Sequence, residues 1–318
     1  MKKNIVAVIL LSLGILAFGQ SKKVKVGVLN GPSCIPVAYL MENFTFTGGT
    51  EVSFEKFADP QALLPKLMKN NADIGFMPVN VAAKVYNSAN GQILCAGITG
   101  LGNLKIITTD ASLKKMTDLQ GKNLWVAGQG ATPEYLMRYL LKEYNYKDDK
   151  TGIRLDFSIP TNQIVPSLIS GKINAAVVPE PFATIAQMKS KKVIIPVNLQ
   201  NEYCYFSGNK DIYPLTVMVV TKKFADENKE LLNQFISAYE AAYLWTVKNP
   251  AASARLVKKY DLGLEEAVVA KAIPVSNYTF IPATEGKKNI EDLLNIFLEN
   301  NSSSIGGKLP DENFYLAE

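Results

Sequence analysis

The sequence predicts an α/β protein of two lobes, each a mostly parallel sheet flanked by helices, joined by a two-strand hinge. Three observations indicate this fold: a repeated segment, a regular alternation of strand and helix patterns, and a long helical pattern at the C-terminal end. In the repeat, residues 61–82 and 162–183 align at a constant offset of 101, with Pro65 opposite Pro166. Each copy has the pattern of an amphipathic helix, a short buried strand ending in proline, and a new helix start.

The N-terminus forms a separate unit. Lys2 and Lys3 precede an apolar run over 5–18, and small residues follow it. This pattern predicts a secretory signal peptide over residues 1–19, cleaved before Gln20. An uncleaved anchor is the alternative, although the run is shorter than the roughly 20 apolar residues that a spanning helix needs.

The first lobe is predicted to contain residues 22–108 and 216–318. Its strands are recognised by short apolar or alternating runs, and its first helices by amphipathic periodicity. The predicted strands are 23–29, 51–57, 73–77, 93–98, 104–108 and 215–220. The predicted helices are 35–42, 60–70, 79–86, 228–248, 250–260, 264–272 and 288–300.

The second lobe is predicted to contain residues 109–215, with the same alternation. Its predicted strands are 119–128, 153–157, 174–178 and 193–197, and its predicted helices are 135–143, 161–170 and 181–189. Alternating strands and helices favour parallel pairing with helices on both faces of each sheet. The chain would cross between the lobes near Ile107 and near Thr216, and two such crossings form a natural hinge for closure.

Composition excludes several classes of function. The formal net charge is +5, or +3 without Lys2 and Lys3, and this modest excess favours neither a nucleic-acid partner nor a membrane surface. The absence of histidine removes the commonest general base and metal ligand. The three cysteines lack metal-ligand spacing, so no metal and no cofactor is predicted. A Cys95–Cys204 disulfide and buried thiols both remain open.

Several motifs occur in the order found in a known family. They are 72–76 after a helix, Leu119 with Gly121 before a strand, and Glu180-Pro181 with Ala183 after a strand. In this order the chain resembles the extracytoplasmic solute-binding proteins of ABC importers that take up nitrate, sulfonates, taurine or thiamine precursors.

The resemblance implies a periplasmic binding protein fold of the second type and a monomer in the periplasm or another extracytoplasmic location. It also implies a non-enzymatic role. A small solute would bind between the lobes, and an ABC permease in the inner membrane would receive it.

Candidate ligand contacts follow from the rule that open α/β sheets bind ligands beyond the carboxyl ends of their strands. Asn30, Ser33 and Cys34 occupy the turn after the first strand, which could equally be a plain connection. Asn80 and Glu180 follow the two repeated strands, and helix capping is their alternative role.

Five further candidates come from a glycine-rich loop, a connector and an aromatic cluster. Gly130, Ala131 and Thr132 precede a helix whose free N–H groups could hold an acceptor group. Thr99 is expected near the hinge. Tyr205 lies in a predicted polar loop and could stack on a planar ligand, or pack on the surface.

The predicted cargo depends on charge. Helix N-termini suit an oxyanion, but Glu180 would repel one, so a neutral or cationic heteroaromatic solute is favoured. The alternative function is an enzyme on the same scaffold, with Glu180, Glu134 or Cys34 as its reactive group. A periplasmic sensor that binds a solute is the other alternative.

Overall fold

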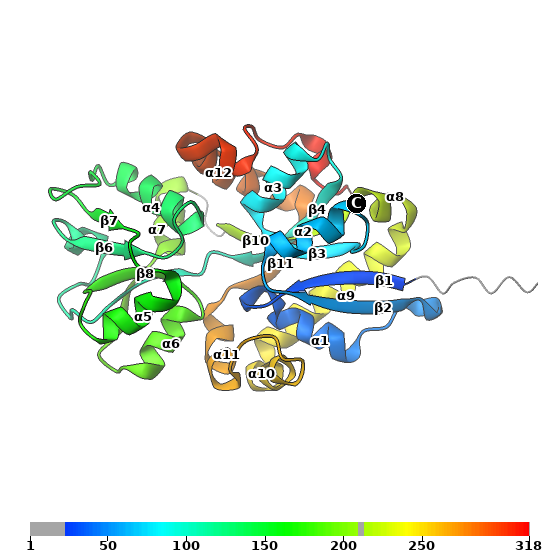
Figure 1. Ribbon diagram of the computed structural model, residues 1–318, viewed down its shortest axis with the longest axis horizontal. Helices are drawn as coiled ribbons and strands as arrows, with labels where there is room; N and C mark the ends of the chain where they lie inside the picture. Colours follow the sequence, from blue (N-terminus) through cyan, green and yellow to red (C-terminus); the bar gives the residue numbers. More distant parts are fainter. Residues whose placement is uncertain (1–22, 209–212, 318) are drawn as a thin grey trace, which may run out of the picture.

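The computed structural model describes residues 23–208 and 213–317, and the predicted signal peptide over 1–19 lies outside them. Within this part of the chain the strands form one sheet of six and one of five, which build lobe 1 and lobe 2 (Figure 1). The strands of lobe 1 are β1 (Lys23–Leu29), β2 (Glu51–Phe57), β3 (Ile74–Pro78), β4 (Ile93–Leu101), β10 (Pro214–Thr221) and β11 (Tyr278–Pro282). The strands of lobe 2 are β5 (Leu104–Thr108), β6 (Asn123–Val126), β7 (Arg154–Asp156), β8 (Ala175–Pro179) and β9 (Ile194–Asn198).

The sheets are mixed rather than mostly parallel as predicted, because β5, β10 and β11 run antiparallel to the strands that they pair with. Parallel pairing joins β1 to β2 and β3, and β6 to β7 and β8. In lobe 1 the order is β11-β4-β10-β3-β1-β2, and β10 pairs antiparallel with both β3 and β4. In lobe 2 the order is β7-β6-β8-β5-β9, and β5 pairs antiparallel with both β8 and β9. The two reversed strands β5 and β10 are those that follow the crossings between lobes.

Helices cover both faces of each sheet. Those of lobe 1 are α1 (Ile35–Asn43), α2 (Pro60–Met68), α3 (Val79–Ser88), α8 (Lys222–Glu227), α9 (Lys229–Lys248), α10 (Pro250–Lys259), α11 (Glu266–Ala272) and α12 (Ala283–Asn301). Those of lobe 2 are α4 (Thr132–Glu143), α5 (Thr161–Ile169), α6 (Phe182–Lys189) and α7 (Leu199–Ser207). In lobe 1, α1 packs on α9 and α10, whereas α3 and α12 pack together (Figure 1).

The sequence repeat is visible in the structure. The bounds of α2 and α5 differ by 101 residues at both ends, as do those of β3 and β8. Each helix leads into the strand that ends in the repeated proline. The repeated segments therefore place β3 and β8 equivalently, and both of these strands end at the boundary between the lobes.

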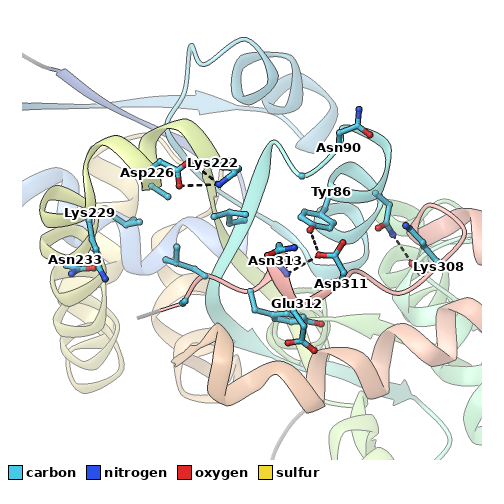
Figure 2. Close-up of a pocket in the computed structure, with 18 residues that line it drawn as sticks. Tyr86, Asn90, Lys222, Asp226, Lys229, Asn233, Lys308, Asp311, Glu312 and Asn313 are labelled. Carbon is cyan, nitrogen blue, oxygen red and sulfur yellow. Dashed lines mark hydrogen bonds and ion pairs between the residues drawn. The ribbon is translucent and has the colours of Figure 1, made fainter.

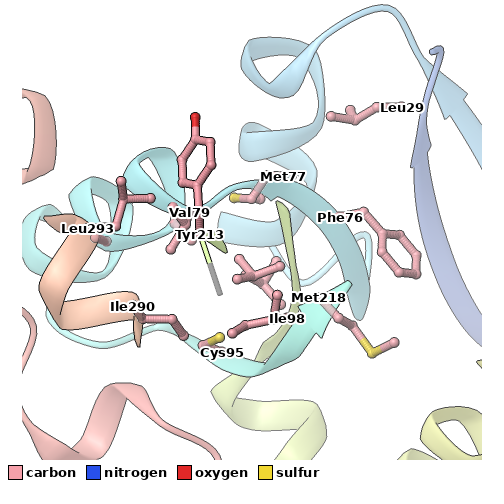
Figure 3. Close-up of a cluster of buried hydrophobic side chains, with 14 of the residues drawn as sticks. Leu29, Phe76, Met77, Val79, Cys95, Ile98, Tyr213, Met218, Ile290 and Leu293 are labelled. Carbon is pink, nitrogen blue, oxygen red and sulfur yellow. The ribbon is translucent and has the colours of Figure 1, made fainter. Parts of the chain in front are cut away.

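A large apolar core holds lobe 1 together. Ile98 of β4 and Ile290 of α12 lie beside Cys95, with Met77 and Val79 nearby (Figure 3). Their side chains are fully buried or nearly so, and each such burial contributes about 1.5–3 kcal/mol. This core continues into lobe 2 where α12 meets α4.

Two segments link the lobes. β4 ends at Leu101 in one sheet and β5 begins at Leu104 in the other, so the change of sheet lies earlier than the predicted crossing near Ile107. The predicted division after residue 108 assigned β5 to lobe 1, and its pairing instead places it in lobe 2. The apolar sequence of β5 does not indicate which of the two sheets this strand joins.

Other differences from the sequence predictions concern α7, β11 and the cysteines. Residues 199–207 form a helix where a polar loop was predicted, and β11 was not predicted. The three cysteines, all in the described part of the chain, form no disulfide bond. Cys95 lies on β4 of lobe 1 and Cys204 on α7 of lobe 2, so the disulfide left open by the sequence is absent.

Candidate functional site

A cavity of about 350 Å³ lies between the two lobes, where strands of both sheets end. This interlobe cavity is within the size range of small-molecule sites. Its walls come from β1, β3, β4, β8, β10, β11 and the turns that follow them. The lining residues are Leu29, Asn30, Pro32, Ser33, Ala58, Asp59, Pro60, Met77, Pro78, Gly100, Leu101, Asn103, Pro179, Glu180, Pro181, Phe182, Leu215, Thr216, Ser276 and Tyr278.

The wall from lobe 1 is held in place by local hydrogen bonds. After β1 the chain turns through Gly31 into a 3-10 turn at Pro32–Cys34. The Tyr278 hydroxyl of β11 donates to the Pro32 carbonyl oxygen at 2.8 Å and ties this turn to the sheet. Asp59 caps α2 by accepting from the Ala62 amide at 2.9 Å.

Glu180 is the central polar residue of the lobe 2 wall. It follows β8 and is 1% exposed. One carboxylate oxygen, Oε2, accepts from the Thr184 amide at 3.1 Å, whereas Oε1 is buried without a hydrogen-bond partner among the described residues. Burial raises the pKa of this carboxyl above its usual value, against the lowering effects of Thr184 and of Lys105.

Asn103 lies beside Glu180 at the crossing between lobes. The Glu180 amide donates to the Asn103 carbonyl oxygen at 3.2 Å, so the two backbones are adjacent. The Asn103 side chain is 6% exposed, and its Oδ1 is also buried without a partner in the described part of the chain. Two residues of the cavity wall, each with a buried oxygen that lacks a partner, are therefore adjacent along their backbones.

A second interlobe cavity, of about 540 Å³, has Glu180 in its wall as well. We call it the lysine-side cavity because Lys105 and Lys271 line it. Burial lowers the pKa of Lys105, and the negative charge of Glu180 opposes that shift. Among the residues that the structure describes, no ion pair joins Lys105 to Glu180, so their charges interact at longer range.

Some residues predicted from the sequence line the interlobe cavity. Asn30 and Ser33 of the first turn are there, together with Glu180 from the opposite lobe. Cys34 is not: it is 1% exposed, and its thiol points to the carbonyl oxygens of Gly31 and Leu262. Burial raises the pKa of the Cys34 thiol to about 12, so the thiolate is disfavoured at neutral pH.

Other predicted residues lie outside the cavity wall. Thr99 is buried, and its hydroxyl bonds to that of Thr216 at 3.1 Å. Asn80 is half-buried in the first turn of α3, and it is Pro78 that reaches the cavity. Tyr205 is 78% exposed on α7, where its ring packs against Phe206 rather than facing the cleft.

The glycine-rich loop binds a carboxylate from the helix that follows it, α4. The Gly130 amide donates to the Glu134 carboxylate at 2.7 Å, and Arg138 contacts the same carboxylate at 2.8 Å. Ala131 and Thr132 follow at the start of α4, and none of the three loop residues lines the interlobe cavity. An internal carboxylate thus holds the place predicted for an acceptor group of the ligand.

Part of the cavity wall was not predicted from the sequence. Asp59 could have been found, because an Asp-Pro pair after a strand is a helix-start signal. Ser276 and Tyr278 could not, because β11 has no distinct strand pattern. Asn103 was missed because the predicted crossing lay further along the chain.

A larger hollow, of about 950 Å³, lies elsewhere. Figure 2 shows it in lobe 1 beside the C-terminal segment, with Tyr86 bonded to Asp311 and Lys222 paired with Asp226. Several of its polar groups are paired, although Asn87 Oδ1 is buried without a partner among the described residues, and its lining residues all come from lobe 1. The smaller interlobe cavity, which residues of both lobes line, is therefore the better candidate site.

Solved structures with this fold cover nearly the whole chain. An ABC transporter protein from Parabacteroides distasonis is 26% identical, covers 93% of this chain and 99% of its own, and has a TM-score of 0.79. The aliphatic sulphonate binding protein SsuA from Escherichia coli is 16% identical, with coverages of 91% and 92% and a TM-score of 0.69. The nitrate-binding protein NrtA from Synechocystis is 13% identical, with coverages of 93% and 87% and a TM-score of 0.59.

These similarities confirm the predicted two-lobed fold. No curated protein has a sequence that matches this chain. Within the described residues, no helix is both long and apolar enough to cross a bilayer. The model of the NMT1-like family matches residues 19–259, which is most of the chain. The chain therefore belongs to the NMT1-like family.

Proposed function

We propose that this chain is the extracytoplasmic substrate-binding protein of an ABC importer. It captures one small solute in the interlobe cavity and delivers it, as a monomer, to a permease in the inner membrane. The observation that carries the proposal is the position of the cavity, whose wall combines strand ends of both lobes. The family match and the ABC transporter relatives support the same role.

Closure of the lobes would couple binding to delivery. Because Ser33 lies on one lobe and Glu180 on the other, a solute that contacts both is bound best when the lobes approach each other. Such a solute shifts the population toward the closed form in proportion to its preference for that form. The permease would then distinguish loaded protein from empty protein by shape.

A catalytic role finds less support at this site. Of the reactive groups that the sequence suggested, Cys34 lies outside the cavity wall and Glu134 is engaged by Gly130 and Arg138. Glu180 lines the cavity, but nothing in the wall completes a nucleophile–base pair with it. Binding without turnover is the simpler function of such a site.

The experiment is a thermal-shift titration of the mature chain with vitamins, heterocycles, amines, sulfonates and inorganic anions. A binding protein gains stability as RT ln(1 + [L]/Kd), so the melting temperature should keep rising with the concentration of its solute. A Ser33→Trp variant fills the cavity and should lose this rise. The matched control is Ser237→Trp, at an exposed position on α9 outside the interlobe cavity.

Two results would contradict the proposal. The first is a melting temperature that no member of the panel raises. The second is a rise of equal size in the native chain and in the Ser33→Trp variant, since binding would then take place elsewhere.

A further inference from the structure

Buried oxygens without hydrogen-bond partners are concentrated where the chain crosses between the lobes. In the described part of the chain, seven buried side-chain oxygens lack a partner. Four of the seven lie at or beside the crossings, and they belong to Asn103, Glu180, Gln200 and Tyr213. They have almost no accessible surface, so neither water nor a solute reaches them in this form. Since native proteins pair nearly all of their buried polar groups, so many exceptions at one joint require an explanation.

Two of these groups, Tyr213 and Gln200, are a complementary donor and acceptor. Tyr213 is fully buried, and in Figure 3 its hydroxyl points away from the apolar side chains of the lobe 1 core. Burial raises the pKa of this hydroxyl well above its usual value, so it keeps its proton and remains a donor. Gln200 Nε2 donates to Cys204 Sγ at 3.4 Å, which leaves Gln200 Oε1 as an acceptor without a partner.

The two side chains border the same glycine. A Cβ added to Gly102 would overlap both the ring of Tyr213 and Oε1 of Gln200. The Gly102 amide also donates to the Tyr213 carbonyl oxygen at 2.6 Å. The donor and the acceptor are therefore neighbours, and a small displacement of one relative to the other would pair them.

Rotation of the lobes is a motion that supplies such a displacement, because the two residues belong to different lobes. Gln200 lies on α7, which contacts α4, β5 and β9 of lobe 2. Tyr213 leads directly into β10, which lies between β3 and β4 in the sheet of lobe 1. When the lobes approach each other around a solute, Gln200 moves with one lobe and Tyr213 with the other.

We propose that Tyr213 and Gln200 are positioning residues for closure: the hydroxyl donates to Gln200 Oε1 in the closed form and has no partner in the form described here. This inference rests on the proposed function and deepens it by naming the pair that sets the balance between open and closed forms. Neither residue lines the interlobe cavity, so the pair acts without touching the solute. Because apparent affinity is proportional to the fraction of protein in the binding-competent form, the pair strengthens binding.

The test is Tyr213→Phe, which should change stability and affinity in opposite directions. Without solute, the variant should unfold at a higher urea concentration than the native chain, because it no longer buries a hydroxyl without a partner. Its affinity should fall about 10- to 100-fold, because the closed form loses its hydrogen bond. Affinity is measured by calorimetric titration with the compound of the thermal-shift panel that raises the melting temperature of the native chain most. A tyrosine with a purely structural role would lower stability when it is replaced.

Tyr86→Phe is the matched control, since the Tyr86 hydroxyl already donates to Asp311 at 2.5 Å within lobe 1. It should unfold at a lower urea concentration and bind as the native chain does. Gln200→Met removes the acceptor and should lower affinity as much as Tyr213→Phe. The double variant should bind no more weakly than either single variant, because the same hydrogen bond is lost in all three.

The outcomes separate the inference from the proposed function. If Tyr213→Phe unfolds at a lower urea concentration than the native chain, the hydroxyl already has a partner and the inference is wrong. Unchanged affinity in Tyr213→Phe, or losses that add in the double variant, also overturn the inference, while solute binding by the native chain still supports the proposed function. If no compound of the panel binds the native chain, the proposed function fails and the inference fails with it.

Discussion

The Gly102 amide donates a hydrogen bond to the Tyr213 carbonyl oxygen at 2.6 Å and so joins the two crossing segments. Gly102 follows β4, and Tyr213 comes directly before β10. These strands are neighbours in the sheet of lobe 1, with Pro214 opposite Leu101. The two crossings therefore act as one joint rather than as independent links.

Gly102→Ala should damage this joint. A Cβ at this position would overlap the ring of Tyr213 and the side-chain oxygen of Gln200. Overpacking of this kind costs about 1–3 kcal/mol and forces the crossings apart. We expect a lower free energy of unfolding in urea, together with a smaller melting-temperature shift at saturating solute.

Gly171→Ala is the matched control. Gly171 has φ of +75° but no heavy atom within 4 Å of an added Cβ, so its substitution costs backbone strain alone. It should lower stability and leave the solute-dependent shift unchanged. An unchanged shift in Gly102→Ala as well would show that the joint plays no part in binding.

Glu180→Gln should make the empty protein more stable at neutral pH. The carboxyl pKa is raised in the folded chain above its ordinary value of 4.5. Below pH 4.5 the Glu180 carboxyl is protonated in both the folded and the unfolded chain and does not lower stability. As pH rises through the raised pKa, the free energy of unfolding falls, because ionisation is less favourable in the folded chain. Gln carries no charge and escapes that loss.

The measurement is the melting temperature of both proteins without solute from pH 4 to pH 8. The difference should be near zero at pH 4 and favour the variant at pH 8, by about 2–4 °C for each kcal/mol recovered. Lys105→Met in both backgrounds separates the contribution of the facing lysine. A variant less stable than the native chain at pH 8 would mean that the charge of Glu180 stabilises the fold.

Tyr278→Phe should loosen the turn that carries Asn30 and Ser33. It removes the hydroxyl that donates to the Pro32 carbonyl oxygen, a loss of about 1 kcal/mol. The free energy of unfolding in urea should fall by that amount, and solute affinity should fall with it. Tyr205→Phe, at an exposed position, should change neither.

Glu134→Gln should destabilise lobe 2 by about 1–3 kcal/mol. The buried carboxylate accepts from the Gly130 amide and holds Arg138, and an amide cannot replace both roles. Glu299→Gln removes an exposed ion pair with Lys142 and should cost less than about 0.5 kcal/mol. Urea unfolding of both variants checks the difference, and equal costs would refute the role assigned to Glu134.

Much of the fold was predictable because the repeat is regular. The helices before β3 and β8 have apolar faces at helical spacing, and the prolines mark where both strands end. These local patterns placed Glu180 at the boundary between lobes. The same logic placed Asn30 and Ser33 after β1.

The remaining site depends on tertiary contacts that local patterns do not encode. Cys34 and Ser33 are adjacent in the sequence, yet one packs inward and the other lines the cavity, because the 3-10 turn rotates them apart. Gly130 has the signature of an anion loop, but the Glu134 carboxylate occupies it. Tyr278 reaches the site from a strand whose pairing with β4 is irregular.

Pulsed electron paramagnetic resonance between spin labels on the two lobes tests the capture of solute by closure most directly. Cysteines at Gln61 and Asn162, in a Cys204→Ser background, place labels on the equivalent exposed first turns of α2 and α5. When the solute that stabilises the native chain is added, the distribution of distances between the two labels should shift to shorter values and become narrower. An identical distribution with and without saturating solute would contradict closure around a bound ligand.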